Sequence, residues 1–283
     1  MNEIFAIDPR APQDLKDIKA MFNQFGFENG RFIANFPNDW LRLFCEHTQQ
    51  LKDIEKQRFM RLVEIHKDTL LDIALDYRRS KTWVENANLA KDTSRSIYRI
   101  LATDPNPLGI ETLQKFLWIE DEENRSRGAH IDMTSDAYQK AIRPLLQRST
   151  EVHLADPFFH LRNPEDGKIH KGRETVLRQF FIEAENSNRC EIFKIHFKRN
   201  KYVSESMQDQ QIEDDLTELS LQVGVKKLDI QYTVSENFSH GRYIFSIKGG
   251  LQFDHGFEPL RDKTNHVHWL SRTELEPILK RYL

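Results

Sequence analysis

The chain of 283 residues contains very little cysteine, with only Cys45 and Cys190. The two stand far apart, and neither belongs to a CxxC pair or to another spacing typical of metal ligands. We therefore predict that both are reduced and buried, in separate domains, as in cytosolic proteins. The pattern indicates no disulfide framework, and we predict no bound metal and no cofactor.

Long apolar runs are also missing. No stretch approaches the ~18 uninterrupted apolar residues that a membrane-spanning helix needs. The first residues, Met1 to Phe5, lack a basic region followed by an apolar run, which is the pattern of a secretory signal. We therefore expect a soluble, cytoplasmic protein without a transmembrane segment.

An excess of one charge is the third absence. The 41 basic and 44 acidic residues leave a net charge of −3. Without a global basic field, the chain can meet nucleic acid or an acidic membrane only through a local patch. Hydrophobic residues make up 39% of the sequence, which is enough to build buried cores in a chain long enough for two domains.

The first half of the sequence has a helical rhythm. Apolar residues at three- and four-residue spacing predict helices over residues 12–25, 37–51, 59–71 and 110–118. A charged loop is expected at 121–128. We predict a mainly α-helical N-terminal domain over residues 1–130, and we expect it to bind a protein partner.

The second half alternates strands with helices. Apolar strand patterns at 152–155, 192–197 and 228–232 are separated by helical patterns at 173–186 and 208–223. Two further strands, at 242–247 and 251–253, flank the turn Gly249-Gly250. This order predicts an α/β domain over residues 131–283, with a mostly parallel sheet and flanking helices.

Ligands of such sheets gather outside the carboxyl ends of the strands. Six candidate residues stand at these ends or in the loop before the following helix: Asp156, Arg162, Lys171, Arg173, Lys198 and Arg199. Cationic side chains beside a helix N-terminus suit an anion. A solvated basic loop is an equally good interpretation of the same residues.

A sharper motif is Ser239-His240-Gly241-Arg242, which precedes a second one, Asp254-His255-Gly256. Strand alternation would place His240 and Arg242 side by side on one face. An arginine offers a fork of donors to a phosphate, and a histidine offers a hydrogen bond or a nucleophile. The competing interpretation is that His240 satisfies a buried carbonyl.

These motifs support a family resemblance. The runs 240–243, 248–250 and 255–258 resemble the end of the phospholipase-D-like C-terminal domain of MIT-domain-containing proteins, while 151–159 and 175–186 resemble its opening. The resemblance covers about 140 residues in order and leaves the N-terminal half unassigned. It implies a phospholipase-D-like fold. Because related domains occur in bacterial defence proteins, it also implies a component of a multiprotein system such as anti-phage defence.

The resemblance also implies a degenerate active site. Active phospholipase-D-type enzymes use a histidine, a lysine two residues on and an aspartate five residues later, normally from two copies of the motif. Here His240 matches, Arg242 replaces the lysine, and Ile247 stands in place of the aspartate. We therefore expect a module that recognises a phosphate of nucleic acid, nucleotide or lipid head group, and lean against an enzyme.

Two alternatives stay open. A homodimer could bring two His240 side chains together as a phosphodiesterase or nuclease, with Asp156 or Asp254 orienting the histidine. The chain could also be a non-catalytic scaffold. His266 and His268 could chelate zinc, but without a third ligand nearby they are better explained as an ordinary strand or loop pair.

The paired and single aromatic residues of this half, Phe158, Phe159, Phe180, Phe181 and Trp269, are expected in the core.

Overall fold

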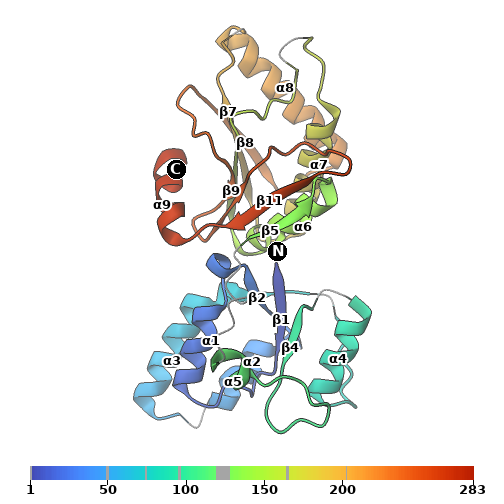
Figure 1. The fold of residues 1–283 in the computed structure, drawn as a ribbon. Helices are drawn as coiled ribbons and strands as arrows, with labels where there is room; N and C mark the ends of the chain where they lie inside the picture. The colour runs from blue at the N-terminus through green and yellow to red at the C-terminus, as the bar shows by residue number, and fades with distance from the viewer. Residues whose placement is uncertain are drawn as a thin grey trace. The chain divides into compact units, whose positions relative to one another are not determined.

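The computed structural model describes residues 2–48, 51–73, 75–94, 97–118, 128–163, 166–201 and 203–283. The chain divides into two compact units, Asn2–Ser126 and Arg127–Leu283, whose helices and strands are labelled in Figure 1. The charged loop expected at 121–128 lies outside the described residues, apart from Gly128, which begins a strand.

The N-terminal unit is built on a parallel sheet. Its described strands are β1 (Glu3–Ile7), β2 (Arg31–Ala34), β3 (Leu70–Leu71) and β4 (Arg99–Leu101), in the order β3-β2-β1-β4. Its helices are α1 (Leu15–Gln24), α2 (Trp40–His47), α3 (Asp53–His66), α4 (Trp83–Ser94) and α5 (Leu113–Trp118). The expectation of a mainly helical domain is therefore wrong, because the helices flank a central sheet.

Alternating residues of β1 explain the two layers of helices. Phe5 and Ile7 pack into the core that α1, α2, α3 and α5 share, whereas Ala6 belongs to a second core with Trp83 and Val84 of α4. A strand buried on both faces reads as a short continuous apolar run without polar alternation. For this reason the sequence pattern did not reveal β1.

The C-terminal unit has a larger, mixed sheet of seven described strands in the order β5-β11-β10-β9-β6-β7-β8. The strands are β5 (Gly128–Asp132), β6 (Glu151–Ala155), β7 (Ile192–Lys198), β8 (Asp229–Ser235), β9 (Arg242–Phe245), β10 (Gly250–Phe253) and β11 (Thr264–Trp269). The predicted α/β class is confirmed. The sheet is mixed rather than mostly parallel: β6, β7 and β8 are parallel, while β9, β10, β11 and β5 join through antiparallel pairs.

Helices cover both faces of this sheet, as Figure 1 shows. They are α6 (Ser135–Arg148), α7 (Lys171–Asn186), α8 (Glu205–Val223) and α9 (Arg272–Tyr282). Phe180 and Phe181 of α7 contact Phe193 of β7 on one face. On the other face Leu275 and Ile278 of α9 pack against strand residues of β6 and β9. The crossovers through α7 and α8 bring the carboxyl ends of β6 and β7 to one edge, beside the start of β9.

Two buried histidines lie on the α9 face of the sheet. His153 of β6 and His196 of β7 are 2% and 4% exposed, and their rings stack on each other with centroids 5.2 Å apart. Hydrogen bonds join His153 Nδ1 to His196 Nε2 at 2.9 Å and His196 Nδ1 to the Thr233 hydroxyl at 2.7 Å, and a Glu151 carboxylate oxygen lies 3.1 Å from His153 Nε2.

The partners of the two rings indicate their tautomers. The carboxylate of Glu151 beside His153 Nε2 favours the proton on that nitrogen; His153 Nδ1 then accepts from His196 Nε2–H, and the Thr233 hydroxyl donates to His196 Nδ1. Every ring nitrogen is thereby satisfied with both rings neutral. Burial and the charge of nearby Lys194 lower the pKa of His153 to about 4, and burial together with His153 and Lys194 lowers that of His196 to about 3.

From the histidine pair we predict that the free energy of unfolding falls as the pH is lowered. The unfolded histidines titrate near 6.5, whereas the folded ones stay neutral down to about 4 and about 3. Their contribution is therefore complete above pH 6.5 and is lost as pH falls below it, by up to ~1.4 kcal/mol per pH unit for each histidine. Urea unfolding at neutral and mildly acidic pH measures this loss.

The double variant His153→Leu/His196→Leu removes both titrating rings at similar side-chain volume and should show a much smaller loss between the two pH values. His255→Gln, at an exposed histidine, should keep the wild-type pH dependence. Equal pH dependence in the wild type and the double variant would contradict this account of the pair.

The remaining expectations about the fold concern cysteines and membrane spans. Both cysteines are free: Cys190 is buried and Cys45 partly buried, in different units, and burial raises the pKa of the Cys190 thiol to about 12. Within the described residues, none of the helices has the length and apolar character to cross a membrane.

Candidate functional site

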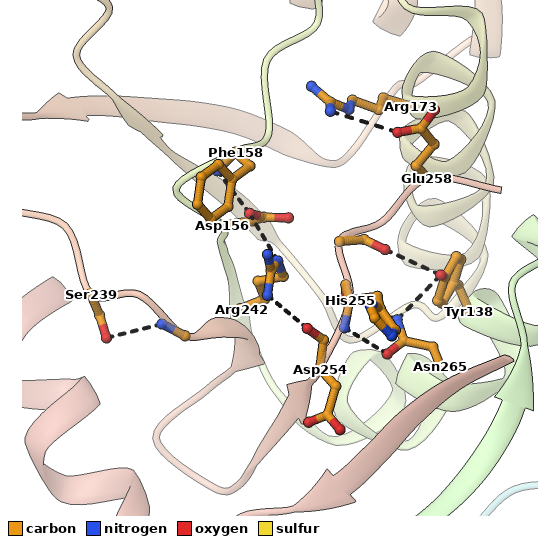
Figure 2. A network of polar contacts seen from close by, with 12 residues as sticks. Tyr138, Asp156, Phe158, Arg173, Ser239, Arg242, Asp254, His255, Glu258 and Asn265 are labelled. Atoms are coloured by element: carbon orange, nitrogen blue, oxygen red, sulfur yellow. Dashed lines mark hydrogen bonds and ion pairs between the residues drawn. The ribbon is translucent and has the colours of Figure 1, made fainter. Parts of the chain in front are cut away.

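The pairing of β6 with β9 brings Asp156 and Arg242 together. Ala155, the last residue of β6, lies opposite Tyr243 of β9. Asp156, which follows β6, therefore lies beside Arg242, the first residue of β9. Arg242 Nε lies 3.7 Å from Asp156 Oδ1, and the Asp156 side chain is only 2% exposed. Figure 2 shows the two side chains at the centre of a network of polar contacts.

Asp156 is held by its own loop and by a close backbone. Its Oδ1 accepts a hydrogen bond from the Phe158 N–H at 2.9 Å. A Cβ on Gly256 would lie 3.1 Å from Asp156 Oδ2, so the lack of a side chain lets this backbone pass close to the carboxylate. Burial raises the pKa of Asp156, while the Phe158 N–H and the charge of Arg242 act in the opposite direction.

Arg242 is positioned by three different contacts. Besides its ion pair with Asp156, it donates from one terminal nitrogen to the Asp254 carbonyl at 2.7 Å, and its guanidinium lies over the Phe158 ring, 5.0 Å from the centroid. The buried Nε–H has no hydrogen-bond partner among the described residues. Since a guanidinium carries five N–H donors, Arg242 keeps donor capacity for a further acceptor.

The loop that supplies the Asp254 carbonyl is anchored by a buried asparagine. Asn265 Oδ1 accepts from the His255 N–H at 2.9 Å, and its Nδ2 donates to the His255 carbonyl at 2.9 Å and to the Tyr138 hydroxyl at 3.3 Å. The Tyr138 hydroxyl in turn donates to the Gly256 carbonyl at 3.2 Å (Figure 2). His255 therefore serves the site through its backbone, and its side chain is exposed.

Most cations predicted from the basic loop and from the end of β7 are engaged with carboxylates. The pairs are Arg162 with Asp215, Arg173 with Glu258 and Arg199 with Asp209, at 2.6, 3.7 and 3.3 Å. Lys171 is exposed and lines an open cleft of about 680 Å³ near the N-termini of α6 and α7. For Arg162 and Arg199, these contacts favour a structural role over the predicted ligand site.

His240 lies elsewhere than strand alternation predicted. Strand β9 begins at Arg242, and His240 sits in a bend before it, with an exposed side chain. None of the hydrogen bonds or ion pairs found among the described residues involves His240. The expected pairing of His240 with Arg242 on one strand face is therefore wrong. Ile247, in place of the motif aspartate, lies beyond the end of β9 and is 63% exposed.

A histidine that sequence reasoning missed belongs to the same edge. Burial lowers the pKa of His160, and the nearby charges of Arg173 and Lys198 lower it further. Arg173 also donates to the His160 carbonyl at 3.2 Å and lowers the pKa of Asp156. The only sequence signal was its place four residues after Asp156. We call Asp156, His160, Arg173, Lys198 and Arg242 the strand-end cluster.

The two histidines considered as a zinc pair lie on β11. His266 Nδ1 is 3.5 Å from Asp254 Oδ2, and its ring lies beside His130 of β5 and His268. Both residues lie within the strand Thr264–Trp269, as the interpretation of a strand pair expected. In the part of the chain that the structure describes, no three histidine, cysteine or carboxylate side chains are grouped to hold a metal ion.

Comparisons with known proteins add little to this geometry. No protein-family model matches the chain, and no curated protein matches it. Among solved structures, a match is TrmBL2, an archaeal chromatin protein described with a novel mode of DNA binding, at 10% identity and a TM-score of 0.28. The match covers 60% of this chain and 54% of that protein. The resemblance to the phospholipase-D-like domain stays a prediction.

Asn265→Ala should destabilise the C-terminal unit by roughly 1–3 kcal/mol. The substitution removes the hydrogen bonds that a fully buried side chain makes to the His255 N–H, the His255 carbonyl and the Tyr138 hydroxyl, and each such bond contributes about 0.5–1.5 kcal/mol. Urea unfolding measures the change. Asn237→Ala, at an exposed position, is the control and should stay within about 0.5 kcal/mol of the wild type. A similar small effect for Asn265→Ala would show that the anchor is dispensable.

Proposed function

We propose that the C-terminal unit is a recognition module for a phosphate-bearing ligand and that the strand-end cluster is its binding site. The main support for the proposal is that Arg242 is fixed in position and still has unused hydrogen-bond donors. This arginine is held rigidly by Asp156, Phe158 and the Asp254 carbonyl at the carboxyl edge of β6, yet it keeps unused donors. A preorganised guanidinium at such an edge is suited to a phosphate.

The neighbouring charges support the same ligand class. Arg173 and Lys198 act on His160, whereas Arg173 and Arg242 act on the buried carboxylate of Asp156, so Arg173 links the two groups of charges. Glu258 engages Arg173 at 3.7 Å, beyond hydrogen-bond distance. The cluster with Glu258 therefore carries a net charge of +1 from three cations and two carboxylates, which suits a local anion site on a chain of net charge −3.

The geometry favours binding over catalysis. A histidine nucleophile needs a carboxylate or another group to orient it. Among the described hydrogen bonds and ion pairs, none gives His240 such a partner, while Asp156 is already engaged with Arg242 and the Phe158 N–H. The partner expected for the N-terminal unit, the homodimer and a role in a defence system stay predictions.

Arg242→Ala should weaken pyrophosphate binding by ~10-fold or more, because a hydrogen bond to a charged group contributes about 1.5–3 kcal/mol. The measurement is the rise in melting temperature that millimolar pyrophosphate causes at low ionic strength. Lys198→Ala removes a cation without stranding Asp156 and should also reduce the rise. For both variants the salt dependence of binding should become shallower.

Arg189→Ala is the matched control, since this exposed arginine precedes β7 at the opposite end of the strand. It should keep the wild-type response. A wild-type protein that gains no stability from pyrophosphate, or a full response in both Arg242→Ala and Lys198→Ala, would sink the proposal. Hydrolysis of a phosphodiester by the wild type that disappears in His240→Ala would favour the enzyme alternative instead.

A further inference from the structure

Phe158 departs from the expectation that both phenylalanines of the 158–159 pair are in the core. Phe159 is 1% exposed and packs near Phe197 and Phe257. Phe158 is 50% exposed. Single exposed hydrophobic residues are common on protein surfaces, so the surroundings of Phe158 decide whether its exposure has a function.

The exposed ring is held in a fixed place beside the ligand site. The Phe158 N–H donates to Asp156 Oδ1 at 2.9 Å, and the Phe159 N–H donates to the Asp156 carbonyl at 3.1 Å. This turn directs Phe159 inward and Phe158 outward. The Arg242 guanidinium lies over the Phe158 ring at 5.0 Å from its centroid, and Figure 2 shows the ring beside Asp156 and Arg242.

The Arg242 guanidinium lies over one face of the Phe158 ring, and half of this side chain is exposed. A planar group that stacked on the opposite face would lie directly next to a phosphate-suited arginine. A ligand that fills both features carries a planar aromatic group close to a phosphate. Inorganic phosphate and a phosphorylated polyol lack the planar group, whereas a nucleotide has both.

We propose that the strand-end cluster binds single-stranded nucleic acid, with one base stacked on Phe158 and its neighbouring phosphate on Arg242. Lys198 and Arg173 would meet flanking phosphates. The inference rests on the proposed phosphate site and adds the class of ligand. A single strand is required because the bases of a duplex are already stacked on each other and present no free face to a protein ring.

Fluorescence anisotropy with a short labelled oligothymidylate at low salt tests the stacking. Phe158→Leu keeps an apolar side chain but removes the π face, and it should weaken binding by roughly 5- to 150-fold. Phe158→Trp keeps a π face and should bind the oligothymidylate with near wild-type affinity. Because the position is on the surface, both variants should melt like the wild type.

An oligonucleotide with abasic sites in place of bases is the matched ligand control. The wild type should bind it as weakly as Phe158→Leu binds the normal oligothymidylate, and Phe158→Leu should cause no further loss on it. This double comparison isolates the base–ring contact from the phosphate contacts. Thymidine monophosphate distinguishes a free nucleotide from a strand, because a strand should bind more tightly through its flanking phosphates.

The outcomes separate this inference from the proposed function. If Phe158→Leu binds the oligothymidylate like the wild type while the Arg242-dependent response to pyrophosphate persists, the stacking inference fails and the phosphate site stands. If the wild type binds neither probe, both fail. The inference would also be overturned if duplex and single-stranded DNA bound with equal affinity, or if thymidine monophosphate bound as tightly as the strand. Binding to anionic vesicles that depends on Phe158, without binding to the oligonucleotide, would overturn it as well.

Discussion

The ion pair between Asp156 and Arg242 joins the segments on which the rest of the site depends. Asp156 follows β6, Arg242 begins β9, and both contact the loop after β10 through the Gly256 backbone and the Asp254 carbonyl. A carboxylate this buried is tolerated only with a cation and hydrogen-bond donors beside it. The requirement fixes Arg242, and Arg242 in turn lies over the ring of Phe158.

Charge pairing decides which of the many cations of this unit remain available to a ligand. Arg162 meets the nearly buried Asp215 with two hydrogen bonds, and Arg199 meets Asp209. These pairs connect the basic loop and the end of β7 to α8. The cations left around Asp156 and His160 make a small local field on a weakly acidic chain, so the proposed site would select its ligand by geometry and stacking more than by long-range attraction.

Further along the same strands, the buried histidines His153 and His196 have partners for all their ring nitrogens only when both rings are neutral. The chain from Glu151 through His153 and His196 to Thr233 crosses three parallel strands under α9. Each ring uses one nitrogen as donor and one as acceptor, so a further proton has no acceptor to meet. The strands that present the proposed ligand site are therefore expected to be held together most firmly at neutral pH.

The sequence by itself determined the α/β character of the second half, because the periods of strand and helix differ there and the hairpin of β9 and β10 has its glycine turn. It also pointed to Asp156 and Arg242. Only the tertiary structure revealed β1, since a strand buried on both faces lacks polar alternation. Tertiary contacts also decided that His240 lies off the strand, that Arg162 and Arg199 are taken by carboxylates, and that Phe158 faces outward. Such outcomes depend on partners distant in sequence, which local spacing does not encode.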